Sequence, residues 1–141
     1  IATAMTAAET GHLIFSSLHT TSASQTVDRS IDTFPADQQT QVTSQLAATL
    51  VAIVSERLLP RIDGGRVPAG EIMIINSALR TLIRERKSYQ IDLVIETSLQ
   101  DGMITLNRTL ARLVKEKEIS LENAELYSQN PSELKILMER I

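Results

Sequence analysis

Apolar and polar positions along this chain of 141 residues follow two patterns, one typical of helices and one typical of strands. An alanine-rich stretch over residues 2–9 ends at Gly11, which predicts a short helix closed by a glycine. The run 12–18 is apolar and includes a β-branched and an aromatic residue, so it predicts a buried strand with a polar end at 19–22. One strand cannot form a sheet by itself, and the pattern therefore indicates partner strands upstream of the printed sequence.

The middle of the chain predicts two helices and a β-hairpin. Ser22 and Gln25 have the spacing of a capping box at the start of a helix. Asp63, Gly64 and Gly65 predict a tight hairpin turn, because glycines readily adopt the positive φ angles that such turns require. The predicted elements here are helices over 23–33 and 36–50 and strands over 51–61 and 66–75.

From Asn76 onward the spacing of apolar residues predicts helices alone. Ser77 is expected to cap a helix over 78–86, and a second helix is expected to stop near Asp101 and Gly102. A third helix is striped by apolar residues from Leu106 onward, and a fourth begins at Ser120. The last helix starts at Pro131 after the cap Asn130, with apolar residues at Leu134, Leu137, Met138 and Ile141.

Composition excludes several classes of protein. The sequence is 43% hydrophobic and 22% charged, which is ordinary for one soluble globular domain. It has no cysteine, which excludes disulfides and thiolate metal sites and fits a cytoplasmic location. The most apolar stretch, 46–60, is interrupted by Ser55, Glu56 and Arg57, so no membrane span is expected. Because the chain opens in mid-pattern without a signal sequence, we expect it to be a piece of a longer protein.

Charge is spread unevenly along the chain. The net charge of −3 argues against nucleic acid as the main partner, since phosphate binding needs a basic surface. Residues 57–87 nevertheless carry seven basic and three acidic side chains. Two interpretations of this basic island stay open: a solvated surface, or a site for an anion such as nucleotide phosphate or an acidic partner.

The first motif lies between Glu9 and Ala23, where Thr-Gly-His at 10–12 leads through the predicted strand into Leu-His-Thr at 18–20. Its two histidines, His12 and His19, stand at opposite ends of the strand, so they cannot bind one metal ion and no metal site is predicted. The motif resembles the His box of the secretion and pilus ATPases. The resemblance implies that His19 senses the γ-phosphate and that Thr20 lies near the nucleotide, at the carboxyl end of the strand where ligands gather. For His12 a catalytic and a structural role both stay open.

The second motif lies on the predicted helix after Asn76. Its apolar residues share one face, and Arg80 and Arg84 share the opposite face because they stand four residues apart. An ordinary amphipathic surface helix would show the same pattern. The stretch resembles the Ala-Ile-Arg-Asn-Leu-Ile-Arg-Glu motif of the type IV pilus retraction ATPases, with Leu79 for Ile and Thr81 for Asn. By this resemblance the residues that couple hydrolysis to retraction are Arg80, Leu82, Ile83, Arg84 and Glu85.

The resemblance extends over about residues 1–127 and implies an α/β fold. Residues 1–75 would be the C-terminal part of a RecA-like P-loop ATPase core, and 76–141 a small all-helical subdomain. The sequence has neither a Gly-x-x-x-x-Gly-Lys-[Ser/Thr] loop nor an acidic Walker B segment, both of which the family places upstream. The chain alone is therefore expected to be inactive and to hold no cofactor tightly.

For the intact protein, the resemblance implies a cytoplasmic homo-hexamer that hydrolyses Mg-ATP to retract type IV pili, as in twitching motility. It would lie at the pilus base, peripheral to the inner membrane, on an inner-membrane platform protein. Arg57 would face the nucleotide, a neighbouring subunit or solvent. Two alternatives stay open. One is a related pilus-assembly or type II secretion ATPase, which usually carries a four-cysteine zinc insert. The other is a non-catalytic helical interaction module.

Overall fold

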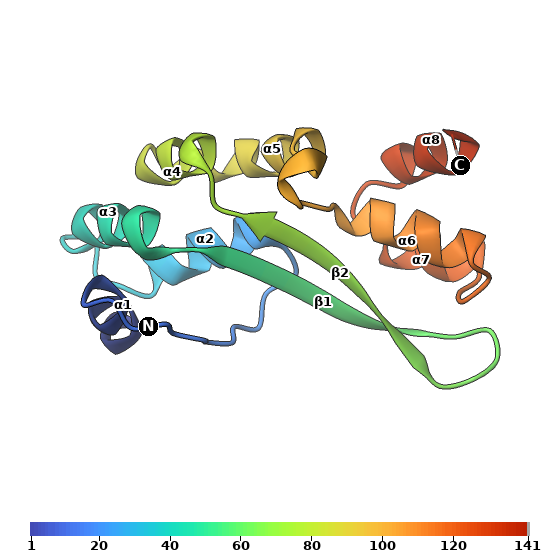
Figure 1. Cartoon of the computed structure of the whole chain (residues 1–141), viewed down its shortest axis with the longest axis horizontal. Coiled ribbons are helices and arrows are strands. Elements are labelled where there is room, and N and C mark those ends of the chain that lie inside the picture. The colour runs from blue at the N-terminus through green and yellow to red at the C-terminus, as the bar shows by residue number, and fades with distance from the viewer. Residues whose placement is uncertain (141) are drawn as a thin grey trace.

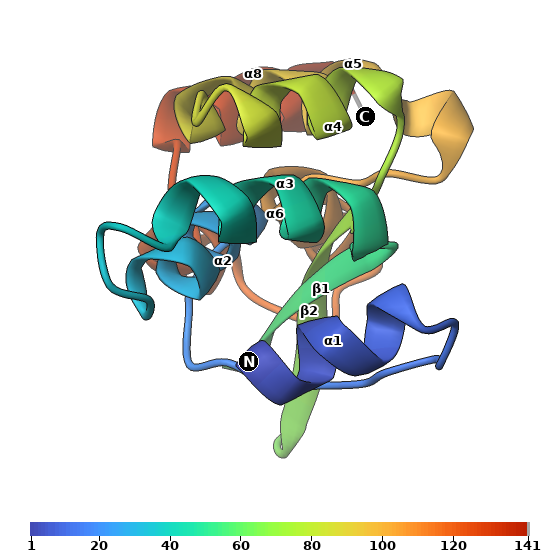
Figure 2. The same ribbon diagram turned by 90° about the vertical axis from the view of Figure 1, so that its left-hand side faces the viewer.

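A long β-hairpin runs through the molecule, with helices packed along it in two groups (Figure 1). The structure is a computed structural model that describes residues 1–140. Its helices are α1 (Ala2–Glu9), α2 (Ala23–Asp32), α3 (Gln39–Thr49), α4 (Ser77–Arg84), α5 (Ile91–Thr97), α6 (Leu106–Lys115), α7 (Leu121–Tyr127) and α8 (Pro131–Arg140). Short 3₁₀ turns are formed by Ser88–Gln90 and Leu99–Asp101, and the strands are β1 (Ala52–Pro60) and β2 (Arg66–Ile74). Seen end-on, α4, α5 and α8 lie above α2 and α3 (Figure 2).

The hairpin confirms the prediction made from its glycines. β1 and β2 pair antiparallel without a break from Ala52 opposite Ile74 to Pro60 opposite Arg66. At the tip, Gly64 and Gly65 have φ angles of 92° and 77°, which residues with a Cβ atom rarely adopt. Within residues 1–140 these two strands make up the sheet, and the outer edge of β2 also forms an isolated antiparallel bridge from Ile72 to Ile104.

Two hydrophobic clusters share the hairpin. The first contains Ile53 and Met73 from one half of the hairpin, together with buried residues of α1 to α5. The second contains Leu59 and Ala69 from the other half, together with buried residues of α6 to α8. The helices α4 and α5 therefore pack with the first cluster, although they follow residue 75. The division of the chain at residues 75 and 76 stays a prediction.

The predicted strand over 12–18 is wrong for the structure as described, where this segment is extended but belongs to no sheet. Leu13 and Phe15 are 76% and 89% exposed. The physical reason is that a strand needs a neighbouring strand with which to exchange backbone hydrogen bonds, and no described strand lies beside this segment.

The helix ends follow the predicted caps with one correction. Ser22 and Ser120 accept hydrogen bonds from the backbone N–H groups three residues on, as expected of N-caps. Asn76, rather than Ser77, caps α4, because its side chain accepts from the N–H of Leu79 at 3.0 Å. Ser77 is the first helical residue. In the last helix, the predicted apolar position Ile141 lies outside the described residues.

Candidate functional site

The carboxyl end of the extended segment is held by groups from distant parts of the chain. The carbonyl oxygen of Thr21 accepts a hydrogen bond from Nη2 of Arg57, on β1, at 3.3 Å. It also accepts one from Nε2 of Gln129, between α7 and α8, at 2.9 Å. Arg57 also donates to the carbonyl oxygen of Tyr127 at 3.4 Å. At Thr21, two residues after His19, the structure thus brings together the end of the first motif, strand β1 and the connection between α7 and α8.

The start of α2 is reinforced by short-range hydrogen bonds. The hydroxyl oxygens of Thr20 and Thr26 are 2.7 Å apart, which ties the predicted nucleotide-proximal residue to the first turns of the helix. Oε1 of Gln25 accepts from the backbone N–H of Thr21 at 2.7 Å. In a standard capping box this bond would come from the N–H of the N-cap, Ser22, so the box is shifted by one residue. The side chains of this turn therefore fix the backbone that leads out of the motif.

Glu71 completes this arrangement, although no functional role was predicted for it from the sequence. Its side chain, on β2, is 7% exposed, and Oε1 accepts from the backbone N–H of Ala23 at 2.7 Å. Ala23 is the first residue of α2, where N–H groups have no partner within the helix. The available signal was the alternation of β2, which places Glu71 on the same face as the buried Ala69 and Met73. A carboxylate at an inward position needs a buried donor.

Burial dominates the electrostatics of Glu71. Loss of water around the carboxylate raises its pKa above the ordinary value of 4.5, with Asp92 and Glu133 acting in the same direction. The hydrogen bond from Ala23 and the charge of Arg57 oppose this rise. Because the folded pKa lies above the unfolded one, this group favours folding most below pH 4.5, and the contribution is lost as the pH rises through the folded pKa.

The two predicted histidines are not brought together. His19 is exposed, beside the reinforced turn. His12 lies at the other end of the extended segment, where its Nδ1 is 3.0 Å from the hydroxyl oxygen of Thr10 and 3.3 Å from the carbonyl oxygen of Ala7. These contacts place His12 against the end of α1. They suit the structural interpretation of this residue, whereas the roles of both histidines stay predictions.

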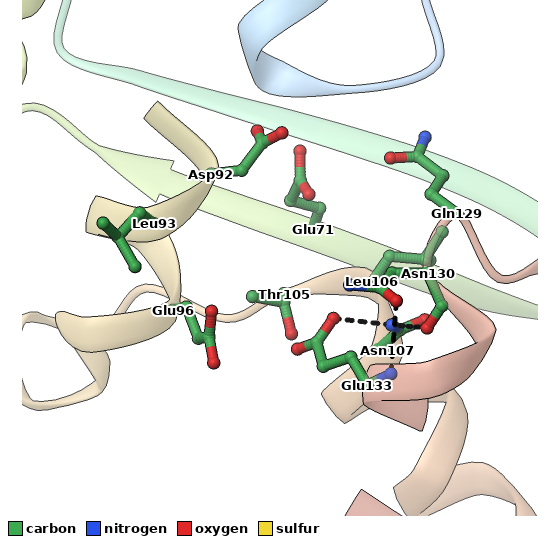
Figure 3. Close-up of a pocket in the computed structure, with 10 residues that line it drawn as sticks. All are labelled: Glu71, Asp92, Leu93, Glu96, Thr105, Leu106, Asn107, Gln129, Asn130 and Glu133. Carbon is green, nitrogen blue, oxygen red and sulfur yellow. Dashed lines mark hydrogen bonds between the residues drawn. The ribbon is translucent and has the colours of Figure 1, made fainter. Parts of the chain in front are cut away.

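A pocket of about 450 Å³ lies between β2, α5, α6 and α8 (Figure 3). Four carboxylates line it, those of Glu71, Asp92, Glu96 and Glu133. Glu133 accepts a hydrogen bond from the side-chain amide of Asn107 at 2.6 Å. Within residues 1–140, no three histidine, cysteine or carboxylate side chains are grouped so that they could hold a metal ion. The pocket is acidic, with one carboxylate from β2, two from α5 and one from α8.

The helix that carries the second motif is anchored by its apolar face as predicted, but Arg80 is placed differently. Leu79 and Ile83 are buried in the first cluster, and Leu82 packs against that cluster while half-buried. Arg80 was expected to stand free on the opposite face, and this expectation is wrong. Its Nη1 donates to the carbonyl oxygens of Ala47 and Ala48, the latter at 2.9 Å.

These carbonyls belong to the last turn of α3, where oxygens lack a partner within the helix and the helix dipole is negative. Arg80 therefore joins α4 to α3. Arg84, in contrast, is exposed, and its Nη2 donates to the hydroxyl of Thr81 at 3.4 Å. Of the two arginines, Arg84 is the one whose guanidinium faces outward.

This difference predicts unequal effects on stability. Arg80→Ala is expected to lower the free energy of unfolding by about 1–2 kcal/mol, because it removes charged hydrogen bonds to two helix-end carbonyls. Arg84→Ala, on the same helix, is the matched control and is expected to change it by no more than about 0.5 kcal/mol. Denaturant unfolding followed by circular dichroism measures both. Equal effects of the two substitutions would contradict the assigned role of Arg80.

No helix within residues 1–140 combines the length and the apolar character needed to cross a bilayer.

Known proteins match this chain over most of its length. Residues 1–66 match the family model described as type II/IV secretion system protein. Over 131 residues, 92% of this chain, the sequence is 48% identical to a twitching motility protein of Neisseria gonorrhoeae. Over 121 residues, 86% of this chain, it is 50% identical to the type IV pilus retraction ATPase PilT of Pseudomonas aeruginosa. The first 66 residues thus match this family, and most of the chain is similar to pilus retraction proteins.

The fold of the chain agrees with these matches. The crystal structure of the pilus retraction motor PilT with bound ADP matches it with a TM-score of 0.84 and 46% identity, over 96% of this chain. The predicted fold class, the C-terminal part of a RecA-like ATPase followed by helices, is thereby confirmed. This chain spans 35% of the length of both curated relatives and 38% of the solved structure.

Proposed function

We propose that this chain is the C-terminal part of a motor that hydrolyses ATP to retract type IV pili. The observation that carries the proposal is the identity of 48% and 50% to a twitching motility protein and a pilus retraction ATPase, over most of this chain. The intact protein would be a cytoplasmic homo-hexamer at the pilus base, bound to an inner-membrane platform protein and using Mg-ATP. The match to a retraction motor with bound ADP supports the choice of nucleotide.

The residues of this chain fit only one side of a nucleotide site. His19 and Thr20 offer an imidazole and a hydroxyl at the carboxyl end of the extended segment, and the guanidinium of Arg57 lies nearby through Thr21. These groups suit a phosphate anion. The sequence has no glycine-rich phosphate-binding loop, so these residues do not make up a complete ATP site. In the proposal, His19 senses the γ-phosphate and the outward face of α4, at Arg84 and Glu85, couples hydrolysis to retraction.

The alternatives differ in testable ways. A pilus-assembly or type II secretion ATPase would usually carry a four-cysteine zinc insert, and this chain has no cysteine, which favours retraction. A non-catalytic helical module would make no use of the motif around His19. The motif is present here, and the turn that follows it accepts hydrogen bonds from Arg57 and Gln129 and donates one to Glu71. This arrangement supports the motor.

The test compares the full-length protein with this chain. The full-length protein is expected to turn over Mg-ATP and to restore pilus retraction in a strain lacking it. The 141-residue chain is expected to show turnover no higher than that of its own His19→Ala variant, because phosphate positioning and the metal site supply most of the catalysis in such enzymes. A full-length protein without ATP turnover would favour the non-catalytic module, whereas turnover without retraction would favour an assembly or secretion ATPase.

A further inference from the structure

Three long-range hydrogen bonds converge on the backbone of Thr21 and Ala23. Glu71 of β2 binds the N–H of Ala23, 48 residues away in sequence. Arg57 of β1 and Gln129 of the α7–α8 connection bind the carbonyl oxygen of Thr21, across 36 and 108 residues. We call these three bonds the turn clamp. They hold the two residues that flank the N-cap Ser22 from both strands of the hairpin and from the C-terminal helices.

Glu71 is the member of the turn clamp with no other structural explanation. Burying a carboxylate is unfavourable unless it gains strong hydrogen bonds, and apolar residues occupy the neighbouring inward positions of β2. The N–H that it binds is at the positive end of the helix dipole, where a negative charge is favourable. α2 is a ten-residue helix, so this dipole is substantial. The carboxylate therefore holds the first N–H of α2, next to the N-cap Ser22.

We propose that Glu71 is a positioning residue, which holds the start of α2 and thereby sets the location of His19 and Thr20. Thr20 is bound in turn to Thr26 on the first turns of the same helix, so a shift of α2 moves Thr20 with it. Gln129 holds the same turn from the C-terminal side, which gives the helices α7 and α8 a direct contact two residues from His19. The role of His19 in this inference rests on the proposed function.

The first experiment measures ATP turnover by the full-length protein. Glu71→Met keeps the volume of the side chain but removes the acceptor, and it is expected to lower kcat about tenfold while KM changes less than about twofold, because small misplacements of a catalytic group cost rate. Glu71→Gln keeps an acceptor oxygen and is expected to restore most of the rate. Asp92→Asn is the matched control: it removes a carboxylate from the same pocket, but this carboxylate makes no bond to α2 in the structure. Equal losses in Glu71→Gln and Glu71→Met would overturn the inference.

The second experiment does not depend on catalysis. Amide hydrogen exchange of residues 20–26 is expected to be about tenfold faster or more in Glu71→Met, since the N–H of Ala23 loses the carboxylate that accepts its hydrogen bond, while exchange in the rest of the chain is unchanged. Gln129→Ala, an exposed substitution, should loosen the same segment even if Glu71→Met does not fold. Unchanged exchange in either folded variant would overturn the turn clamp. If the wild type hydrolyses no ATP but these exchange effects appear, the proposed function fails and the turn clamp stands.

Discussion

In the intact protein, His19→Ala is expected to lower kcat for ATP hydrolysis about 100-fold while KM for ATP changes less than about threefold. A group that contacts the γ-phosphate as charge develops stabilises the transition state more than the bound substrate, so its loss appears mainly in kcat. His19 is exposed on the described chain and sits beside a turn held by Thr20, Thr21 and Glu71. Its side chain is thus exposed to a ligand, while the backbone of the following residues is held by hydrogen bonds. Steady-state kinetics of the purified protein measure both constants.

His12→Ala supplies the comparison for this prediction. His12 belongs to the same motif, but its ring contacts Thr10 and the end of α1. Its replacement is expected to affect stability more than kcat. His19 would have no γ-phosphate role if His19→Ala turned over ATP like the wild type. The same would hold if the variant and the wild type had the same relative affinities for ADP and ATP.

Arg84→Ala combined with Glu85→Ala is expected to abolish pilus retraction and leave ATP turnover within about twofold of the wild type. Both side chains are exposed, and their replacement should cost little stability. Glu85 forms an ion pair with Lys87 at 2.7 Å, in which both side chains are about half exposed, so this pair contributes little to the fold. Retraction is measured by microscopy of the pili, and turnover and oligomeric state are measured on the purified protein.

The matched control for that double variant is the exposed ion pair of α6. Arg112 and Glu116 are 2.7 Å apart and about as exposed as Glu85 and Lys87. Replacing both with alanine is expected to leave retraction unchanged. Retraction at the wild-type rate in the α4 variant, or its loss in the α6 variant, would remove the coupling role from α4. Leu82 and Ile83, which the family motif also includes, pack against or within the core, so their substitution tests the fold rather than the coupling.

Local signals in the sequence predicted most of the elements. The hairpin depended on Gly64 and Gly65, whose positive φ angles are a property of a few neighbouring residues. The helices after Asn76 depended on apolar spacing, and the caps at Ser120 and Asn130 on short side chains that reach their own backbone. Signals of this kind depend only on residues that are close together in the sequence, so the sequence alone is enough to recognise them.

Contacts between distant parts of the chain were not predictable in this way. The residues that Arg80 and Glu71 bind lie 33 and 48 positions away, and nothing in their own neighbourhoods names Ala47 or Ala23 as the partner. The strand expected over 12–18 fails for a related reason. Its composition favours an extended conformation, but a strand also requires a second segment at hydrogen-bonding distance.

The hairpin has a mechanical consequence. One end of this nine-residue ladder is embedded in the cluster that includes α2 to α5, and the other end in the cluster of α6 to α8. The pairing of β1 with β2 is continuous, so one ladder joins the two clusters. Ile104, just before α6, is also bonded to Ile72 of β2 through both backbone groups, at 2.9 and 3.0 Å. A movement of the C-terminal helices would therefore be passed through the hairpin to the helices beside His19.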